Sequence, residues 1–257
     1  MMNNRIFGVF AISLSFCTPV LSQNYTLSGI RAKRVEVTSV LDSCESAKDA
    51  LRFIGKYKTS VDSVVGRVLG HSSMLLSAAR PESLLSNWAA DVLLESAHQH
   101  DKRGEKADFS IVNVGGLRSS LPAGEITTGD IFEFSPFQNK LVIVSMKGVD
   151  VLELFRQFSV FGGEGVSHGV EIVYEKNMTL KSARLNGKKI KKSKTYRVAT
   201  LDYLCEGNDN MRAFTKSFNV YNTDMLVRDI YMNKVMEAEA KGEMIGSRIE
   251  GRTVIKK

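Results

Sequence analysis

The sequence contains little cysteine, little proline and, after its first residues, no long apolar run. Only three of its 257 residues are cysteine and four are proline. Three cysteines exclude a disulfide-rich scaffold, and an apolar fraction of 43% is enough for a conventional core in a chain of this length. No repeat or low-complexity tract is present, and no later segment reaches the roughly 20 apolar residues that a transmembrane helix needs. The sequence therefore predicts a globular protein without a membrane span.

The first 22 residues have the order that is typical of a secretory signal peptide. A charged start is followed by an apolar stretch at 6–16 and by small residues before Gln23. We therefore expect residues 1–22 to be removed and the protein to be exported, as a periplasmic or secreted protein. A lipoprotein acylated at Cys17 is the weaker alternative, because bulky Phe16 stands where a small residue is expected.

Removal of that signal would leave two cysteines, Cys44 and Cys205. They could form one disulfide in an exported protein, but sequence alone cannot show that they meet. Two unpaired buried thiols are an equally good interpretation, and both remain open at this point.

The chain is basic, with a net charge of +7 and a pI near 9.2. This charge invites a nucleic-acid interpretation, but the lysines and arginines are spread along the chain. The densest cluster, at 186–194, contains Asn186-Gly187 between two apolar runs, which is the signal for a β-hairpin. Because no aromatic residues alternate with these lysines, a solvated hairpin tip is favoured over a site for single-stranded nucleic acid.

Apolar periodicity divides the rest of the chain into alternating helices and strands, with strands clustered late in the sequence. This order predicts one α+β domain over residues 23–257, built on a mixed β-sheet flanked by helices, with residues 23–60 leading into it. Pro81 is expected in the first turn of its helix, and Thr127 with Asp130 has the form of a capping box. The expected helices are 44–57, 81–100, 129–134, 149–158 and 224–242; the expected strands are 63–75, 109–114, 141–148, 169–175, 182–190, 195–201 and 252–257.

The loop after the expected strand 109–114 combines residues suited to binding a ligand. Gly115-Gly116 would let backbone amides approach a ligand closely, and the planar guanidinium of Arg118 suits a phosphate or a carboxylate. Asn113 could hold a hydroxyl or a ring nitrogen through its amide, and Phe137 could present a ring face to a flat heterocycle.

Each of these residues also has a purely structural interpretation. The two glycines could only form a turn, Arg118 could only pair with Glu125 or Asp130, and Phe137 could only fill the core. Spacing alone gives the two interpretations about equal weight.

A longer motif distinguishes them. The stretch "IVNVGGLRSSLPAGEITTGDIFEFSPFQNKLVIVSMKG" at 111–148 resembles the C-terminal domain of the 5′-nucleotidase family, whose motif is Asn-x-Gly-Gly-Ile-Arg, then Leu-Pro-x-Gly-x-Ile-Thr and Pro-Phe. The resemblance continues through "RPESLLSNWAADVL", "FGGEGVSHGVEIVYE", "TYRVATLDYL" and the tail "EGR", so it covers most of residues 60–257. It implies the fold of that domain.

The resemblance also implies a nucleoside site in which two aromatic rings enclose the base. The roles in this family fall here on Phe137 as one ring and on Asn113 and Arg118 as substrate contacts. An upstream arginine on the phosphate side corresponds to Arg80, although its spacing to Glu82 is one residue shorter than in the family. The candidate substrate-binding residues are Asn113, Gly115, Gly116, Arg118, Phe137, Arg80, Asp209 and Met211.

The sequence departs from the family pattern at 207–211. Family members have Gly-Gly-Asp-Gly and then an aromatic, whereas this chain has "GNDNM". Asn208 and Asn210 can replace glycine where φ is positive, but Met211 cannot stack as a second ring, so base binding is expected to be weaker or less selective. Phe214 could substitute for that ring, although core packing is the favoured role.

The family's catalytic chemistry resides in an N-terminal metallophosphoesterase domain with two metal ions, and this sequence contains no such domain. The four histidines, His71, His98, His100 and His168, lack the Asp-x-His or Gly-Asn-His-Asp arrangement and are interpreted as structural or surface residues. No Ser-His-Asp or Cys-His grouping offers another mechanism. We therefore expect no catalytic residue, metal or other cofactor in this chain.

The leading hypothesis is the nucleotide- or nucleoside-recognition subunit of a split exported 5′-nucleotidase, active in nucleotide catabolism. A separate metallophosphoesterase chain would supply the divalent metals, and the pair would hydrolyse phosphomonoesters. The alternative is a stand-alone nucleotide-binding protein or a degenerate scaffold without catalysis. Nucleic-acid binding ranks last.

Overall fold

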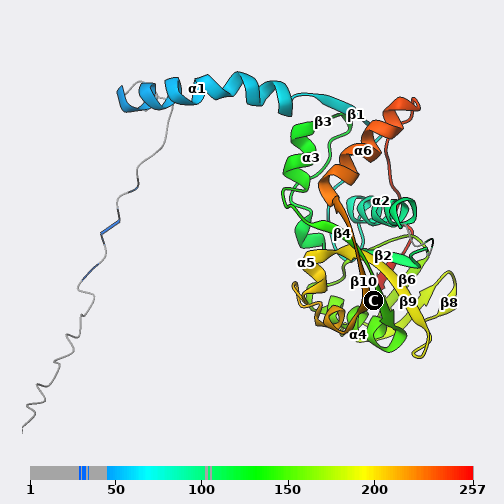
Figure 1. Ribbon diagram of the computed structural model, residues 1–257. Coiled ribbons are helices and arrows are strands. Elements are labelled where there is room, and N and C mark those ends of the chain that lie inside the picture. Colours follow the sequence, from blue (N-terminus) through cyan, green and yellow to red (C-terminus); the bar gives the residue numbers. More distant parts are fainter. Residues whose placement is uncertain are drawn as a thin grey trace, which may run out of the picture. The chain divides into compact units, whose positions relative to one another are not determined.

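A computed structural model describes most of the chain after residue 44 (Figure 1). The chain divides into two compact units, Met1–Arg52 and Phe53–Lys257. The expected signal peptide, Cys17 and Cys44 lie outside the described residues, so the disulfide with Cys205 is not observable. The described residues are 29, 31–32, 34, 45–101, 104 and 106–256.

Helix α1, Glu45–Val65, confirms the predicted helix at 44–57 and continues for two more turns. In its second-unit part, the apolar side chains Ile54, Tyr57, Val61 and Val64 recur at helical spacing, and each is more than half exposed. The structure therefore has an amphipathic helix whose apolar side is uncovered within the described part of the chain. Among the described residues, no helix is both long and apolar enough to cross a membrane.

A five-stranded sheet forms the centre of the second unit. Its strand order is β10-β4-β9-β2-β5, and only the β9–β2 pair is parallel. The expected mixed sheet is therefore confirmed. The inner strands are almost wholly buried, as a sheet covered on both faces requires. The strands are β10 (Phe218–Leu226), β4 (Lys140–Lys147), β9 (Thr195–Leu201), β2 (Phe109–Val112) and β5 (Gly165–Val166).

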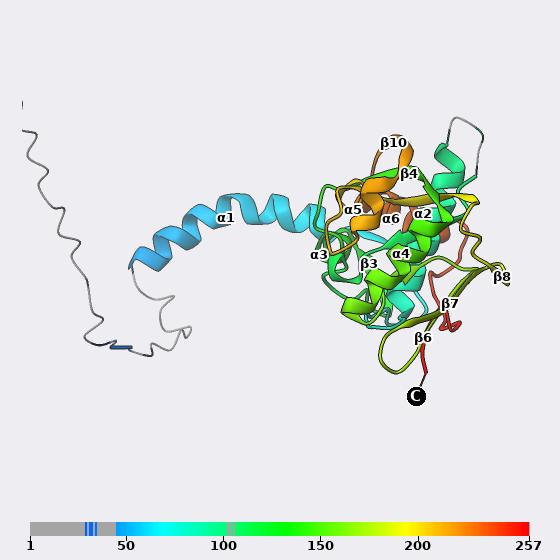
Figure 2. The same ribbon diagram turned by 90° about the horizontal axis from the view of Figure 1, so that it is seen from below.

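The described residues also form two smaller sheets. One has the order β11-β6-β7-β8 and brings the C-terminal strand beside β6 (Figure 2). The other pairs β1 with β3. The predicted hairpin is confirmed, because Asn186 and Gly187 connect β7 to β8 with positive φ angles of 49° and 73°. The strands are β11 (Thr253–Ile255), β6 (Val170–Tyr174), β7 (Leu180–Leu185), β8 (Lys188–Lys189), β1 (Val68–Ser72) and β3 (Gly124–Thr127).

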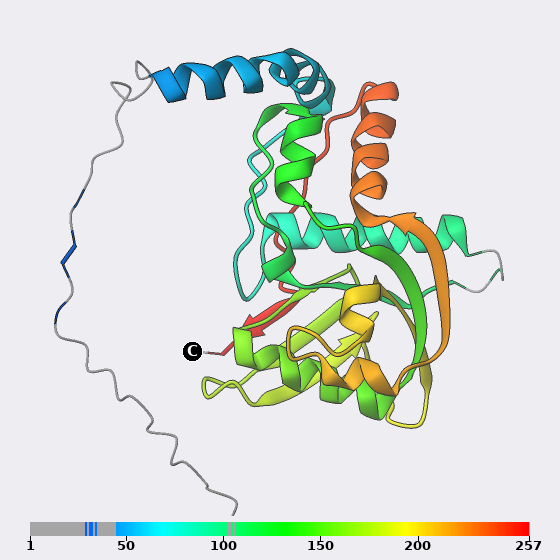
Figure 3. The ribbon, with the colours of Figure 1, turned by 60° about the vertical axis from the view of Figure 1, so that its left-hand side comes forward.

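Helices cover the five-stranded sheet. Helix α2 packs on β2 and β5, whereas α4 packs on β4 and β9 (Figure 3). The rings of Trp88, Phe134 and Tyr231 join α2, α3 and α6, with centroid separations of 5.0 to 6.0 Å. These aromatic contacts hold the three helices to one another. The helices are α2 (Leu84–His100), α3 (Thr128–Phe134), α4 (Gly148–Phe158), α5 (Asp202–Cys205) and α6 (Val227–Ala240).

Two helix starts test the sequence predictions directly. The capping box at α3 is confirmed, since the Thr127 hydroxyl accepts from the Asp130 amide while the Asp130 carboxylate accepts from the Thr127 amide. The prediction that Pro81 lies in the first turn of α2 is wrong. Ser83 caps that helix through its reciprocal bonds with Ser86, so Pro81 precedes the cap.

Candidate functional site

A cavity of about 230 Å³ lies where the end of β2 meets the segments that follow α3 and α5. Six of the eight predicted substrate-binding residues line it, together with two residues that were not predicted, Asn139 and Tyr203. The lining residues are Asn113, Gly115, Gly116, Arg118, Phe137, Asn139, Tyr203 and Asp209.

The predicted glycine loop forms one wall of this cavity. Strand β2 ends at Val112, and the chain then makes one turn of 3₁₀ helix over Val114–Gly116. A Cβ on Gly116 would come within 2.8 Å of the Asn113 side-chain oxygen, so only glycine fits there without displacing Asn113. The Gly116 amide also donates to the Asn113 carbonyl at 3.0 Å. The loop therefore holds Asn113 tightly against the cavity.

A hydrogen-bonded network joins Asn113, Asp209 and Tyr203. The Asn113 Nδ2 donates to Asp209 Oδ2 at 2.5 Å, and the Tyr203 hydroxyl donates to Asp209 Oδ1 at 3.0 Å. The bond to Asp209 raises the pKa of Tyr203, so the phenol stays neutral and continues to donate. Each carboxylate oxygen retains acceptor capacity beyond these bonds. Asp209 is thus a fixed anionic acceptor at the cavity.

Two aromatic side chains line the cavity and remain accessible. Phe137, which follows Pro136 after α3, is 47% exposed, and Tyr203 in α5 is 37% exposed. Neither ring fills the core, so the core interpretation of Phe137 does not apply. Two accessible aromatic side chains therefore lie at the wall of the same cavity.

Arg118 offers the cationic group of the cavity. Its Nη1 donates to the Gly115 carbonyl at 3.2 Å. The alternative pairing with Asp130 is not observed, because that carboxylate caps α3. Within the described segments, Arg118 makes no ion pair with Glu125 either. Most of the guanidinium donors are therefore available for an anion.

Met211 and Arg80, the other predicted residues, do not line the cavity. Met211 is only 1% exposed and packs in the core, as does Phe214. Arg80 donates through Nε to the Gly163 carbonyl at 2.9 Å and pairs through Nη2 with Glu164 at 2.8 Å. The structure therefore brings Asn113, Asp209 and Arg118 together and leaves these two apart from them.

The backbone at 207–211 explains where Met211 lies. Gly207, Asp209 and Asn210 have positive φ angles of 85°, 50° and 59°, whereas Asn208 does not. The expectation of positive φ was thus right for Asn210 and wrong for Asn208. The side-chain Nδ2 of Asn208 donates to the Tyr203 carbonyl. Two successive left-handed residues direct Asp209 toward the cavity and Met211 into the core.

Tyr203 is the main site residue that sequence reasoning missed. It lies in "TYRVATLDYL", a segment already matched to the family, six residues before Asp209. An accessible tyrosine directly after a buried strand, near an expected loop carboxylate, was the available signal. The family pattern places the second ring at position 211, where this chain has Met211, and so gives no indication of Tyr203.

The described residues do not fit a dimetal centre. Among them, no group of three or more His, Cys, Asp or Glu side chains could hold a metal ion. The histidines make separate contacts: His71 with Glu239, His98 with the Ala107 carbonyl, His100 with the Ser96 carbonyl and His168 with Asp91.

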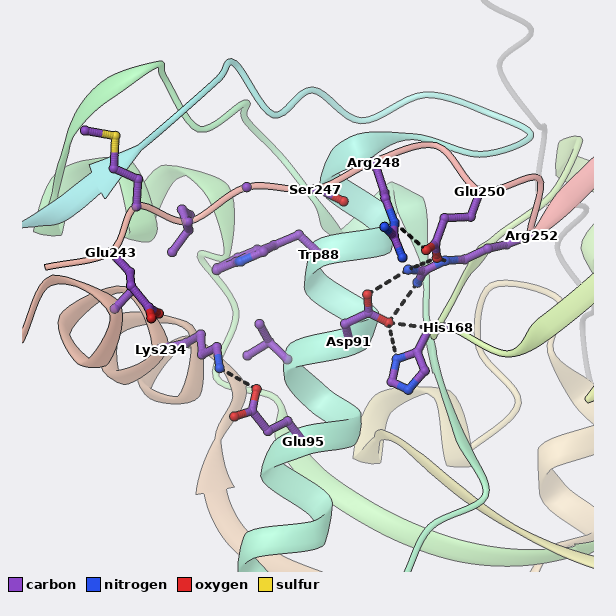
Figure 4. Close-up of a pocket in the computed structure, with 15 residues that line it drawn as sticks. Trp88, Asp91, Glu95, His168, Lys234, Glu243, Ser247, Arg248, Glu250 and Arg252 are labelled. Carbon is purple, nitrogen blue, oxygen red and sulfur yellow. Dashed lines mark hydrogen bonds and ion pairs between the residues drawn. The ribbon is translucent and has the colours of Figure 1, made fainter. Parts of the chain in front are cut away.

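A larger cavity, about 580 Å³, lies between α2, α6 and the segment 243–252 (Figure 4). Its charged side chains mostly pair with one another. Arg252 bonds to Asp91 and Glu250, and Lys234 bonds to Glu95. These pairs connect the C-terminal segment and the helices. In the smaller cavity, by contrast, Arg118 has no ion-pair partner in the described part of the chain, so that cavity is the candidate for a ligand site.

Comparison with known proteins places this geometry in a family context. A family model described as "5′-nucleotidase, C-terminal domain" matches residues 64–216. The chain is 30% identical over 203 residues to Protein UshA of Yersinia enterocolitica and 31% identical over 206 residues to the NAD 5′-nucleotidase of Haemophilus influenzae. These matches cover 73% and 70% of this chain but only 35% and 33% of those proteins. The chain therefore corresponds to about a third of each relative.

Solved structures agree on the fold. The 5′-nucleotidase precursor of Thermus thermophilus superposes with a TM-score of 0.69 at 22% identity, covering 82% of this chain and 43% of that one. The Haemophilus influenzae NAD nucleotidase gives a TM-score of 0.59 at 20% identity, over 84% of this chain and 44% of that one. The α+β fold predicted from the sequence is confirmed as that of these neighbours.

Proposed function

The chain belongs to the family of 5′-nucleotidase C-terminal domains, and from this membership we propose that it is the nucleotide-recognition subunit of an exported 5′-nucleotidase. The observation that carries the proposal is the 230 Å³ cavity, where two accessible rings, a fixed carboxylate and the available guanidinium of Arg118 face one volume. This combination suits a ligand with a flat heterocycle at one end and a phosphate at the other.

We assign each part of the nucleotide to a group in the cavity. The base would lie between Phe137 and Tyr203. Tyr203 would take the place of the second ring, which the family has at the position of Met211. The ribose hydroxyls would donate to Asp209, with Asn113 holding that carboxylate in place. The phosphate would accept hydrogen bonds from the Arg118 guanidinium.

The catalytic metals belong, in this proposal, to a separate metallophosphoesterase chain. The described residues bind the nucleotide and present its phosphate, and the partner's dimetal centre would activate water there. The exposed apolar side of α1 gives the partner a surface to cover, because uncovered apolar stripes of this kind mark protein contacts. Phosphomonoester hydrolysis would then require both chains.

Export fits the same proposal. The expected signal peptide at 1–22 would direct the chain out of the cytoplasm. One relative, 29% identical over 190 residues that cover 68% of this chain and 24% of that protein, is named as the cell wall protein Lmo0130 of Listeria monocytogenes. Nucleotides outside the cytoplasm would therefore be the substrates, and their catabolism the role.

Replacing Arg118 with alanine should weaken the binding of a nucleoside monophosphate more than that of the nucleoside. A hydrogen bond to a charged group contributes about 1.5–3 kcal/mol, and only the monophosphate would lose it. Isothermal titration with AMP and adenosine measures the difference, which should be about tenfold or more. Arg156→Ala is the matched control, because Arg156 is an exposed arginine paired with Glu153. Equal losses for both ligands would show that Arg118 does not contact phosphate.

The partner surface on α1 is tested by charge substitution. Val61→Asp should reduce co-purification with the metallophosphoesterase chain and lower AMP hydrolysis by the mixture by roughly tenfold or more, equivalent to at least about 1.4 kcal/mol. Thr59→Asp, on the same exposed helix but outside the apolar stripe, should change neither. Hydrolysis of AMP by the rigorously purified chain alone would overturn the assignment of catalysis to a partner.

A further inference from the structure

Glu164 is a buried carboxylate close to the candidate site but outside its lining. It lies directly before β5, and its side chain is only 1% exposed. Its Oε2 accepts from the backbone N–H of Val114 at 2.5 Å, and its Oε1 accepts from Arg80 Nη2 at 2.8 Å. Burying a carboxylate is costly unless it is paired and hydrogen-bonded, and both oxygens here are satisfied.

Arg80 is held in place from three sides. Besides the pair with Glu164, its Nε donates to the Gly163 carbonyl at 2.9 Å, and its guanidinium lies 5.7 Å from the centre of the Phe161 ring. These contacts direct the guanidinium to Glu164 and to the turn before β5. The group is therefore committed to the protein rather than directed into the cavity.

The bond to Val114 links this pair to the binding loop. Val114 stands between Asn113 and Gly115, both of which line the cavity. Strand β5 itself is fixed against β2, since Gly165 pairs with Val112 and leaves no room for a Cβ there. Glu164 thus reaches the loop from the residue before a strand that is paired with β2, and it holds the backbone next to Asn113.

We propose that Glu164 and Arg80 are positioning residues of the nucleotide site: Arg80 orients Glu164, and Glu164 holds the Val114 amide and so sets Asn113 against Asp209. This inference rests on the proposed function, because it concerns the same cavity. It assigns to Arg80 an indirect role in place of the direct phosphate contact expected from the family resemblance.

The two roles of Arg80 predict different losses. A direct phosphate contact would make Arg80→Ala weaken AMP binding more than adenosine binding, as expected for Arg118. A positioning role acts on Asn113, so Arg80→Ala should weaken both ligands by the same factor. The Arg80→Ala/Glu164→Ala double variant should then lose no more affinity than Glu164→Ala alone, because both changes break one chain of contacts.

The experiment titrates adenosine and AMP into the wild-type chain and into Glu164→Ala, Glu164→Gln and Arg80→Ala. We expect Glu164→Ala to weaken both ligands at least tenfold. Glu164→Gln should lose clearly less, because its amide oxygen can still accept from Val114. Glu153→Gln, at an exposed position, is the control and should bind as the wild type does. Thermal unfolding of each variant identifies any that fails to fold.

A ligand-independent readout separates this inference from the proposed function. In nitrogen-edited NMR spectra, the amide signals of Val114, Gly115 and Gly116 should shift in Glu164→Ala more than those of other residues. Unchanged loop signals, or Glu164→Ala binding both ligands with wild-type affinity, would overturn the inference. If the wild type bound neither ligand while the loop signals shifted, the proposed function would fail and the positioning contact would stand.

The pH dependence supplies a further check. Burial raises the pKa of Glu164 and the nearby charge of Asp209 acts in the same direction, whereas Arg80 and the Val114 amide lower it. The ionised form holds Arg80, so adenosine affinity should fall as the pH drops through this raised pKa. Glu164→Gln cannot titrate at this position, so its affinity should fall clearly less over the same range, with the Asp209 carboxylate of the site still present. Parallel profiles for the two proteins would contradict the role of the ionised carboxylate.

Discussion

Replacing Phe137 with alanine is expected to weaken the binding of AMP and adenosine alike by about 5- to 150-fold. The reason is the loss of one face of base stacking, which contributes about 1–3 kcal/mol per base. Phe137 is nearly half exposed beside the cavity and makes no aromatic pair in the described structure, so the substitution removes little core packing. Isothermal titration with both ligands measures the loss.

The control for Phe137 is available on the preceding helix. Phe132 lies on α3, is similarly exposed and does not line the cavity. The Cζ atom of Arg228 lies 3.9 Å from the centre of its ring. Phe132→Ala should therefore leave both affinities unchanged. Tyr203→Ala should resemble Phe137→Ala and lose somewhat more, because it also removes the bond to Asp209. Wild-type affinity in Phe137→Ala would remove this ring from the site.

Replacing Arg252 with alanine is expected to lower the free energy of unfolding by about 3–5 kcal/mol, which is the cost of breaking a buried ion pair by removing one partner. Arg252 is buried and bonds to Asp91, Glu250 and the carbonyls of Asn87 and Val166. It thereby joins the C-terminal segment to α2 and β5. Urea unfolding followed by circular dichroism measures the change.

Arg248 provides the comparison for this prediction. It pairs with the same Glu250 but is 83% exposed, and exposed pairs contribute at most about 1 kcal/mol. Arg248→Ala should thus shift the urea midpoint only slightly. Equal effects of the two substitutions would show that burial does not determine the contribution of Arg252.

The loop at 113–118 was predictable from sequence because its motif is local. Asn113, Gly115, Gly116 and Arg118 lie within six residues, and the structure gathers all four around one cavity. Phe137 belongs to the same continuous stretch. A short motif of this kind specifies its own turn, so the sequence alone indicates which side chains are brought together.

Which of the predicted and unpredicted side chains meet at the cavity depends on backbone geometry that sequence patterns do not specify. Two successive positive φ angles, at Asp209 and Asn210, determine that Asp209 faces the cavity and Met211 does not. The proposed role of Glu164 depends on the pairing of β5 with β2. Strand β5 has only two residues, which are too few to show the alternation of apolar and polar side chains that predicts a strand. Such tertiary relations place Tyr203 and Glu164 near the loop.

The same limit applies to the strand β10. Its register with β4 shifts twice, Asn219 and Asp224 have positive φ angles, and most of its side chains are partly or fully exposed. An irregular edge strand shows no clean alternation of apolar and polar side chains. The sequence therefore did not indicate β10, and the helix expected from residue 224 begins only at Val227, where this strand has ended. The regular, buried strands β4 and β9 were predicted nearly to the residue.

The central claim is that this chain recognises a nucleotide without needing a metal. Calorimetric titration of the chain with AMP, adenosine and inorganic phosphate, with and without EDTA, tests it most directly. We predict that EDTA changes the affinity of neither AMP nor adenosine. In both conditions AMP should bind more tightly than adenosine, because Arg118 contacts its phosphate. Absence of binding by AMP and adenosine in both conditions would contradict the claim.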